Sequence, residues 1–371
     1  MKYDVVIVGC GPAGASLGYL LLKNNIKVAI IDKKKFPREK LCGGLFTYKS
    51  KLLYEEIFEK EFTSYINKTN NVNFFKKDNL ILNLKTKIPF YLVSRKEFDF
   101  DIYKEYINKG GICFTESTIS KIDTENNFIY LSSGKKIMYS ILIGADGANS
   151  QVRKLIDKEY KPNGFCLEVE EFPIKNSNNI NIHFDCFYKG YGWCFNKGSF
   201  STVGFGGEYN KQKILESTEL SNVIFKYYNV NSKDVKGAFV PFGKFVKNPC
   251  KGNILLIGDA AGFTDPITGE GLYFCFKSAI YACNAIKDYF SYNNKFTLEE
   301  LYLPKVREIQ EKIKEANKLK KFIFNKVFKN LTFAFLKNNL EFTKYVCDDI
   351  ISTYTRNYKH IISSYLLSRL K

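Results

Sequence analysis

The sequence predicts an α/β protein made of a dinucleotide-binding domain with a parallel sheet, an inserted domain with an antiparallel sheet, and a helical segment at the C-terminus. Three observations carry this prediction. Apolar, β-branched runs lead into glycine-rich turns at three widely separated points, which is typical of parallel strands in one sheet. Residues 165–240 instead show short alternating or aromatic-rich runs, which favour antiparallel strands. Residues 299–371 follow a helical pattern and are basic.

The chain has 371 residues, enough for two domains and an appendage. We expect residues 1–160 and 245–295 to form the first domain, a Rossmann-like unit with short strands inserted at 72–92. The antiparallel domain is expected at 161–244. The C-terminal helical region is expected at 296–371.

The first glycine-rich turn lies between two predicted strands, at residues 3–8 and 27–31, and it opens a helix. In such a βαβ unit one glycine permits the tight turn, a second lets the backbone approach a pyrophosphate, and a third lets helix and strand pack closely. Asp32 ends the second strand, where a carboxylate can bind a ribose diol. The turn therefore predicts a dinucleotide site made by Gly9, Gly11, Pro12, Ala13, Gly14 and Asp32.

Composition limits the remaining possibilities. Hydrophobic residues make up 45% of the chain and charged ones 25%, as in ordinary globular proteins. The net charge of +18 favours anionic partners. The ten cysteines are scattered and form no CxxC pair, and only two histidines are present, so we expect reduced thiols, a cytoplasmic protein and no metal site. We also expect no signal peptide and no membrane span.

A basic loop follows Asp32 and begins at Lys33. It contains a proline and the pair Gly43–Gly44, so it cannot form a regular element, and it can lie across a cofactor. Cys42 could face the reaction centre, but a small buried hydrophobe is the interpretation that spacing alone favours.

Further elements follow up to residue 150. We expect a helix at 51–66, short antiparallel strands at 72–92, and a helix that begins near Arg95 and runs to about residue 109. Arg95 is either an anion or cofactor contact or a surface charge. A strand pair is expected at 112–122 and a hairpin at 128–139. A buried strand then ends in Asp146 and Gly147, at the crevice where α/β sheets bind ligands, and a helix begins near residue 152.

In the antiparallel region, glycines at 204 and 206 lack a following helix, so no second dinucleotide site is expected. His183 alternates with apolar neighbours and is interpreted as structural. The chain then returns to the first domain with a buried strand ending in Gly258 and Asp259. A glycine-rich loop leads from there into a helix at 272–290, whose N–H groups can face an anion.

The tail has one apolar face that includes Ile323, Phe324, Phe328, Leu331 and Phe335, and an opposite basic face. Such an amphipathic pattern fits either docking on the protein core or contact with an anionic membrane surface. Docking is the more common arrangement.

Four motifs occur in a recognisable order. They are GxGxxG with Asp32, SRxxFD at 94–99, GADGxxSxVR at 144–153, and GDAAGFxxPxxGEG at 258–271. Together they resemble FAD-dependent oxidoreductases of the p-hydroxybenzoate hydroxylase-like fold. The runs 36–44 (FPREKLCGG) and 191–197 (YGWCFNK) are similar to the geranylgeranyl reductase family in particular, although Asn196 replaces that family's proline. The resemblance covers residues 1 to about 290.

This resemblance implies a flavin site and a substrate site. It implies that FAD is bound by the residues of the first turn and by Asp32, Lys33, Arg95, Asp146, Gly147, Gly258, Asp259, Pro266, Gly269, Glu270 and Gly271. It places Cys42 on the substrate side of the flavin, as a catalytic residue. It also implies that the substrate is bordered by Gly43, Gly44, Tyr191, Trp193 and Phe195.

The activity that the resemblance implies is reduction of carbon–carbon double bonds in an isoprenoid chain. NAD(P)H or a ferredoxin-like protein would supply the electrons. One alternative is an FAD-dependent monooxygenase or halogenase on the same fold. Another is a basic, flavin-stabilised protein that binds membranes or nucleic acid, although no nucleic-acid motif is present and no specific nucleic acid is expected.

Overall fold

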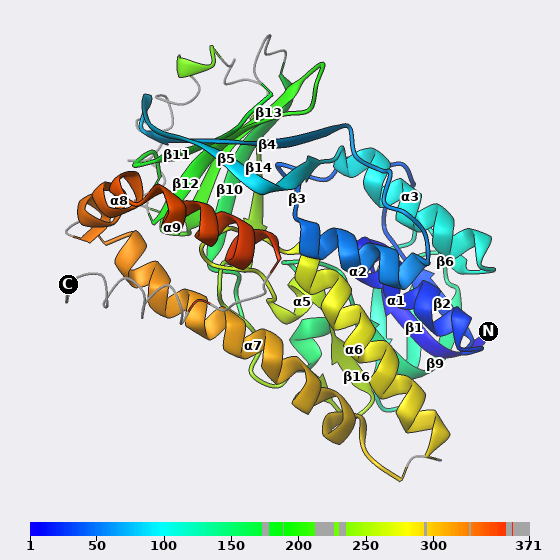
Figure 1. The fold of residues 1–371 in the computed structure, drawn as a ribbon. Helices are drawn as coiled ribbons and strands as arrows, with labels where there is room; N and C mark the ends of the chain where they lie inside the picture. Colours follow the sequence, from blue (N-terminus) through cyan, green and yellow to red (C-terminus); the bar gives the residue numbers. More distant parts are fainter. Residues whose placement is uncertain are drawn as a thin grey trace.

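The structure is a computed structural model with two sheets, a layer of helices over the first, and helices that run back across the second (Figure 1). It describes residues 1–172, 178–187, 189–211, 226–229, 235–292, 295–325, 328–353 and 358. Residues 212–225, which follow the expected antiparallel strands, lie outside this part of the chain.

The first sheet contains five parallel strands in its centre, in the order β16, β9, β1, β2, β6. Antiparallel strands extend it: β15 pairs with β16, and β7 and β8 follow beside β9. The strands are β1 (Lys2–Val8), β2 (Val28–Ile31), β6 (Ile112–Phe114), β7 (Ile119–Asp123), β8 (Phe128–Leu131), β9 (Lys136–Gly144), β15 (Cys250–Lys251) and β16 (Ile254–Leu256). Val5, Val6 and Ile7 are fully buried because both faces of the sheet are covered.

Four helices pack beside this sheet. Helix α1 contacts both α3 and α6, and α2 contacts α6. They are α1 (Pro12–Lys23), α2 (Tyr48–Phe58), α3 (Arg95–Asn108) and α6 (Leu272–Ser291). Their apolar faces and the sheet form the main core, which confirms the Rossmann-like architecture expected for the first domain.

Three details of this domain differ from the sequence prediction. Residues 112–122 do not form a strand pair: β6 pairs in parallel with β2, whereas β7 pairs with β8. The helix expected near residue 152 is one 3₁₀ turn, Val152–Leu155. The helix expected at 51–66 is α2, which ends at Phe58 because Glu59 adopts a left-handed conformation, with φ of +52°.

The second sheet follows the order β14, β10, β13, β12, β11, β4, β5, β3 in the described residues. It is antiparallel except where β11 runs parallel to β4. Its strands are β3 (Leu45–Phe46), β4 (Asn67–Lys76), β5 (Asn79–Leu92), β10 (Gly164–Phe172), β11 (Ile180–Phe184), β12 (Gly190–Asn196), β13 (Ser201–Glu208) and β14 (Lys236–Val240).

The hairpin β4–β5 therefore belongs to the second sheet, not to the first domain as the sequence analysis placed residues 72–92. The cause is tertiary pairing: Val72 lies opposite Ile180, and both side chains are buried in one apolar cluster. The second sheet is thus built from two stretches of chain on either side of β9.

The C-terminal helices return to the body of the protein. They are α7 (Leu298–Ile323), α8 (Phe328–Asn338), α9 (Leu340–Tyr345) and a π-helix (Val346–Ser352). Helix α7 begins at a capping box formed by Thr297 and Glu300 and packs along α6. Helix α9 and the π-helix contact β5, and the rings of Phe333 and Phe184 lie 4.6 Å apart. Residues of α8, α9 and the π-helix thus dock on the second sheet (Figure 1).

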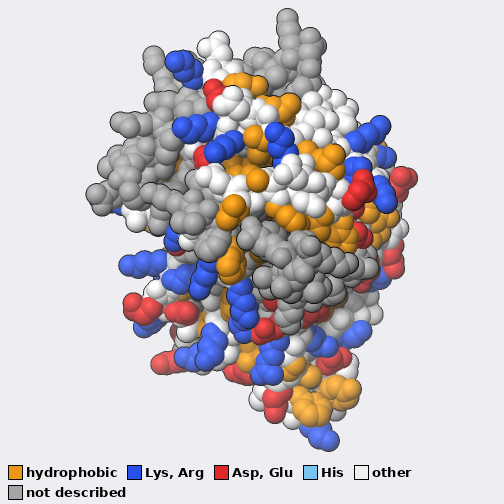
Figure 2. Space-filling model, turned by 60° about the vertical axis from the view of Figure 1, so that its left-hand side comes forward, with side chains coloured by type: hydrophobic (Ala, Val, Ile, Leu, Met, Phe, Trp, Pro, Cys, Tyr) orange, Lys and Arg blue, Asp and Glu red, His pale blue; other side chains and the backbone are white. Residues whose placement is uncertain are grey.

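In the residues that the structure describes, the apolar face expected for the tail is divided between two helices. Helix α7 ends at Ile323, a new helix begins at Phe328, and Leu331 is 45% exposed. Figure 2 shows acidic and hydrophobic side chains among the Lys and Arg side chains on the face it presents. Within the part of the chain that the structure describes, no helix combines the length and apolar character needed to cross a bilayer.

Candidate functional site

The turn between β1 and α1 accepts only glycine at two positions. Gly9 has φ of +100°, and a Cβ there would lie 2.4 Å from the carbonyl oxygen of Ala145. A Cβ on Gly14 would lie 1.9 Å from the carbonyl oxygen of Gly9. Helix α1 begins at Pro12 after Gly11, and no side chain caps it. The free N–H groups of its first turn therefore face outward, an arrangement that suits a phosphate.

Asp32 joins this turn to the loop that follows β2. Its Oδ2 accepts the N–H of Cys10 at 2.8 Å, and its Oδ1 accepts the N–H of Lys34 at 2.8 Å. Each carboxylate oxygen retains a lone pair for a further donor such as a ribose hydroxyl. The side chain of Lys33, also predicted to bind the cofactor, is exposed beside it.

Asp146 lies next to the same turn, at the carboxyl end of β9. Its Oδ2 accepts the N–H groups of Gln151 at 2.6 Å and Val152 at 3.4 Å. Its Oδ1 is buried without a hydrogen-bond partner, and burial raises the pKa of the carboxyl group. An orphaned acceptor beside a glycine-lined phosphate cradle fits a bound dinucleotide. Gly147 follows with φ of +78° and open space around it.

The loop after β16 closes on itself. Gly258 begins the short helix α5 (Gly258–Ala261), and Asp259 accepts the hydroxyl of Thr264 at 3.1 Å. Asp265 Oδ1 accepts the N–H groups of residues 267 and 268 at 2.8 and 2.9 Å. The loop from Pro266 to Gly271 is held in this way and leads directly into α6. Arg153, which the sequence analysis did not select, donates to the carbonyl of Ala260 at 3.1 Å and so ties this loop to the end of β9.

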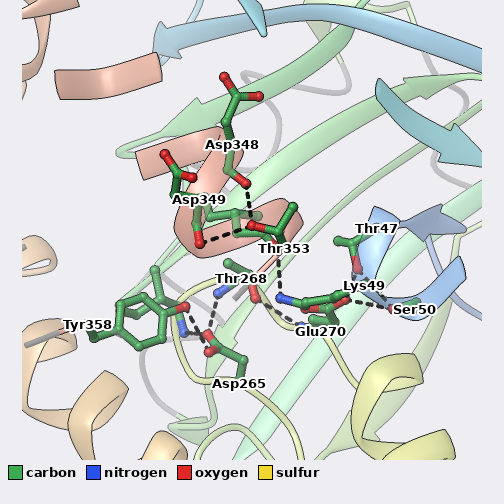
Figure 3. Close-up of polar contacts among 12 residues, drawn as sticks. Thr47, Lys49, Ser50, Asp265, Thr268, Glu270, Asp348, Asp349, Thr353 and Tyr358 are labelled. Carbon is green, nitrogen blue, oxygen red and sulfur yellow. Dashed lines mark hydrogen bonds and ion pairs between the residues drawn. The ribbon is translucent and has the colours of Figure 1, made fainter. Parts of the chain in front are cut away.

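Glu270 turns its side chain toward the start of α2 (Figure 3). Its carboxylate lies 2.6 Å from Lys49 Nζ and accepts the hydroxyls of Thr47 at 2.5 Å and Ser50 at 3.1 Å. Lys49 Nζ also donates to the carbonyl of Ile351 in the π-helix at 2.6 Å. Burial lowers the pKa of Lys49, and the ion pair with Glu270 opposes that shift. Glu270 thus joins the loop to α2, and Lys49 joins both to the C-terminal segment.

Arg95 is buried at the start of α3, so its interpretation as a surface charge is wrong. Its guanidinium makes two bonds to Asp99, at 2.7 and 3.1 Å, and lies close to the Cys42 side chain. Burial opposes the charge, but Asp99 and Cys42 raise the pKa of Arg95. Arg38 lies 3.2 Å from Asp99 and 3.4 Å from where a Cβ on Gly11 would lie. Arg38, Asp99 and Arg95 therefore form a charged chain that runs from the glycine turn toward Cys42.

The loop that carries Cys42 packs against β12. A Cβ on Gly43 would lie 2.7 Å from the ring of Phe195 and 3.1 Å from Trp193 Nε1. Gly44 has φ of +78°, and a Cβ there would lie 3.0 Å from Lys197 Nζ. The loop thus needs both glycines to reach the strand.

Strand β12 also reaches the loop before α6. The hydroxyl of Tyr191 donates to the carbonyl of Thr268, and it lies 3.2 Å from where a Cβ on Gly269 would lie. The structure therefore brings together the predicted substrate residues, Cys42 and the loop 266–271. These segments come from three distant parts of the sequence.

One face of the second sheet is apolar and is turned toward these loops. Trp193 and Phe195 belong to a cluster against which Ile351 of the π-helix packs. The cluster also contains Val72, Phe90, Leu92 and Ile180, with Leu45, Phe74, Cys166, Ile182 and Tyr191 around it. His183 has its ring nitrogens 2.7 Å from the carbonyl of Lys77 and from the Tyr228 hydroxyl, which confirms its structural role.

Sequence reasoning missed two buried polar residues in this region, Glu168 and Lys197. Both are under 4% exposed, and both lie close to Cys42. A charged residue that alternates with apolar neighbours in a strand is normally expected to face solvent. Only the packing of the Cys42 loop over this face buries them. All ten cysteines of the chain are free thiols.

Comparison with known proteins agrees with this architecture. A family model described as lycopene cyclase protein matches residues 4–173. An uncharacterised protein of Methanosarcina barkeri is 31% identical over 334 residues, covering 87% of this chain and 84% of that protein. The geranylgeranyl diphosphate reductase of Rhodobacter capsulatus is 26% identical over 300 residues, covering 77% and 75%. The chain belongs to the geranylgeranyl reductase family of FAD-dependent oxidoreductases.

Solved structures of this family and of related flavoproteins share the fold. A geranylgeranyl bacteriochlorophyll reductase-like protein of Thermoplasma acidophilum superposes with a TM-score of 0.71 at 18% identity, covering 94% of this chain and 98% of that one. A probable FAD-dependent monooxygenase of Pseudomonas aeruginosa gives 0.66 at 17% identity, with coverages of 88% and 97%. A halogenase in complex with FAD gives 0.63 at 18% identity, with coverages of 96% and 86%. The fold is therefore common to reductases, monooxygenases and halogenases.

Proposed function

We propose that the protein reduces carbon–carbon double bonds in an isoprenoid chain, with FAD as cofactor. The observation that carries the proposal is the meeting of Cys42 with the apolar face of the second sheet, where the loop 266–271 also arrives. An apolar face suits a hydrocarbon chain, and a thiol at its edge suits proton delivery. The reductases of isoprenoid compounds among the relatives support the same activity.

In this proposal the first domain holds FAD. The phosphates lie at the turn Gly9–Gly14 and the first turn of α1, and Asp32 binds the ribose of the adenosine half. Asp146 and Gly147 lie beside the pyrophosphate, Asp259 binds the ribityl chain or a phosphate, and Arg95 contacts the cofactor from α3. The loop Pro266–Gly271 lies beside the flavin ring, where the N-terminus of α6 stabilises negative charge.

The chain's own residues orient the substrate, exclude water and supply a proton. Bound, reduced flavin supplies a hydride to one carbon of the alkene. Trp193, Phe195 and Tyr191 hold the hydrocarbon against the sheet, and the Cys42 thiol gives its proton to the other carbon. The side chains of Arg95 and Lys197 lie close to Cys42 on this side of the site.

The electron donor and the surroundings of the reaction are part of the proposal. NAD(P)H or a ferredoxin-like protein reduces the flavin, and an apolar substrate of this kind is taken from a lipid phase. The net charge of +18 would favour an anionic membrane surface as the place of that encounter.

The decisive experiment uses the FAD-loaded protein, photoreduced without oxygen and mixed with vesicles that carry a geranylgeranyl lipid. We expect anaerobic reoxidation of the flavin and a product heavier by pairs of hydrogen atoms. The second candidate is a monooxygenase, which the shared fold of the Pseudomonas protein favours. A flavin that stays reduced with the lipid and reoxidises only with oxygen and a hydroxylated product would support that candidate instead.

Cys42→Ala is expected to lower the rate of lipid-dependent reoxidation by about 10²–10⁴-fold, the usual contribution of a general acid. Flavin content should not change, because the thiol lies on the substrate side. Cys283→Ala, in a buried thiol on α6, serves as the matched control and should keep the wild-type rate. Equal rates in the wild type and in Cys42→Ala would remove Cys42 from the mechanism.

A further inference from the structure

Glu168 is a buried acid in the middle of the substrate face. It lies on β10 opposite Gly204 of β13, which in turn lies opposite Trp193 of β12. Directly opposed residues share one face of a sheet, so Glu168 and Trp193 point to the same side. A Cβ on Gly204 would lie 2.6 Å from both Glu168 Cβ and Trp193 Cζ2. The glycine thus leaves room for the indole to lie beside the acid.

Two polar atoms of this pair have no hydrogen-bond partner. Glu168 Oε1 and Trp193 Nε1 are both buried without a hydrogen-bond partner. The Glu168 residue as a whole is 2% exposed. Buried polar atoms without partners are rare, because each costs the free energy of its lost hydration. Both atoms lie on the same face of the sheet, under the Cys42 loop. This arrangement indicates a site that binds a polar molecule or transfers a proton.

The surroundings of Glu168 tie it to Cys42. The residue after Cys42 lies against the indole beside Glu168, since a Cβ on Gly43 would lie 3.1 Å from Trp193 Nε1. Lys197 lies close to both Glu168 and Cys42, and Arg95 lies close to the Cys42 side chain. Glu170, two residues along the same strand, is the other acid that faces the group.

Burial and the neighbouring Glu170 favour the protonated form of Glu168 near neutral pH. Burial, and then the like charge of Glu170, raise the pKa of Glu168 to about 7, while Lys197, the Cys42 N–H and Arg95 oppose the shift. Burial also lowers the pKa of Lys197, which weakens its pull on the acid.

We propose that Glu168 restores the proton that Cys42 gives up in each turnover. This inference rests on the proposed reductase function. The S–H bond of Cys42 breaks as the alkene carbon gains its proton. The O–H bond of Glu168 then breaks and the S–H bond forms again, directly or by way of one bound water. The carboxylate left behind is held by Lys197 until solvent returns a proton.

The first test observes the acid itself and needs no substrate. Infrared spectra of the FAD-loaded protein are recorded against pH for the wild type, Glu168→Gln and Glu170→Gln. We expect a protonated-carboxyl band that disappears near pH 7 in the wild type and is missing in Glu168→Gln. In Glu170→Gln the band remains but its midpoint moves to lower pH, because a like charge has been removed. A Glu168→Gln spectrum identical to wild type at every pH overturns the proposal.

The second test separates proton return from a merely structural role. Protein that is kept reduced by continuous photoreduction without oxygen is mixed with a geranylgeranyl lipid, and the first turnover is compared with later ones at pH 7. Glu168→Gln should keep the first turnover, since Cys42 still carries its proton, and should slow later turnovers at least tenfold. Glu170→Gln should also keep the first turnover, and its later turnovers should slow less than those of Glu168→Gln, because removing the like charge lowers only the fraction of Glu168 that is protonated at pH 7. An equal loss in the first and later turnovers, or no loss, overturns the proposal.

A third readout remains available if the wild type reduces no isoprenoid, which is the outcome in which the proposed function fails. The rate of Cys42 alkylation by iodoacetamide, followed by mass spectrometry, is then measured against pH. When Glu168 loses its proton near pH 7, its negative charge disfavours a thiolate nearby. The curve of alkylation rate against pH should therefore show a second inflection in the wild type and in Glu170→Gln, and this inflection should be missing in Glu168→Gln. A single inflection in all three overturns the coupling between the two residues.

Discussion

Replacing Gly14 by alanine is expected to abolish FAD binding and to destabilise the first domain. The new Cβ would lie 1.9 Å from the carbonyl oxygen of Gly9, a backbone atom that cannot move aside without opening the turn. Overpacking of this kind costs about 1–3 kcal/mol, and a clash with backbone lies at the upper end. The measurement is flavin content after reconstitution, together with the free energy of unfolding of the flavin-free protein.

Gly11→Ala is the matched variant. A Cβ there would meet only the end of the Arg38 side chain, at 3.4 Å, so the flavin-free protein should keep its stability to within about 1 kcal/mol. Flavin affinity should still fall, because the added methyl group lies where the backbone approaches the pyrophosphate. A Gly14→Ala protein that binds FAD as the wild type does would show that the turn is not the phosphate site.

Lys49→Met is expected to lower the free energy of unfolding by about 3–5 kcal/mol, the usual cost of leaving one partner of a buried ion pair alone. Lys49 and Glu270 have side chains that are 4% and 7% exposed, and the carbonyl of Ile351 would lose its donor as well (Figure 3). Urea unfolding followed by the fluorescence of Trp193, the single tryptophan, measures the loss.

Lys104→Met provides the comparison, because its pair with Asp101 lies at the surface of α3 and should contribute about 0.5 kcal/mol or less. The double variant Lys49→Met/Glu270→Gln should recover part of the loss, since no charge is then left buried alone. A loss in Lys49→Met as small as that in Lys104→Met would show that Lys49 does not hold the loop and the C-terminal segment together.

Much of the first domain could be predicted because its signals are local. The apolar run before Gly9, the glycine spacing and Asp32 all lie within 32 consecutive residues. Each of these signals predicts the backbone conformation of the residues that carry it. Helix α6 followed from the same kind of signal, a glycine-rich loop that leads into an apolar helix. Predictions of this type failed in the extent of two helices, α2 and the 3₁₀ turn at Val152–Leu155, and in strand pairing, since β6 paired with β2 rather than with β7.

The site was predicted in its parts but not in its assembly. Cys42, Gly43 and the strand Tyr191–Phe195 were selected by family resemblance, yet no sequence signal places a loop near residue 43 against a strand near 193. Glu168 and Lys197 were missed for the same reason. An acid and a lysine in exposed-looking strand positions become buried only when another part of the chain covers them.

The sequence by itself determined the glycine turn Gly9–Gly14, the parallel strands around it and the family, because backbone conformation and hydrophobic period are properties of neighbouring residues. The tertiary structure alone decided that β4 and β5 join the second sheet, that Lys49 links α2 to the π-helix, and that Glu168 is buried beside Cys42. Strand pairing and burial depend on which parts of the chain, distant in sequence, pack against each other. The free energy of a charged side chain depends on this burial and on its spatial neighbours, not on its neighbours in the sequence.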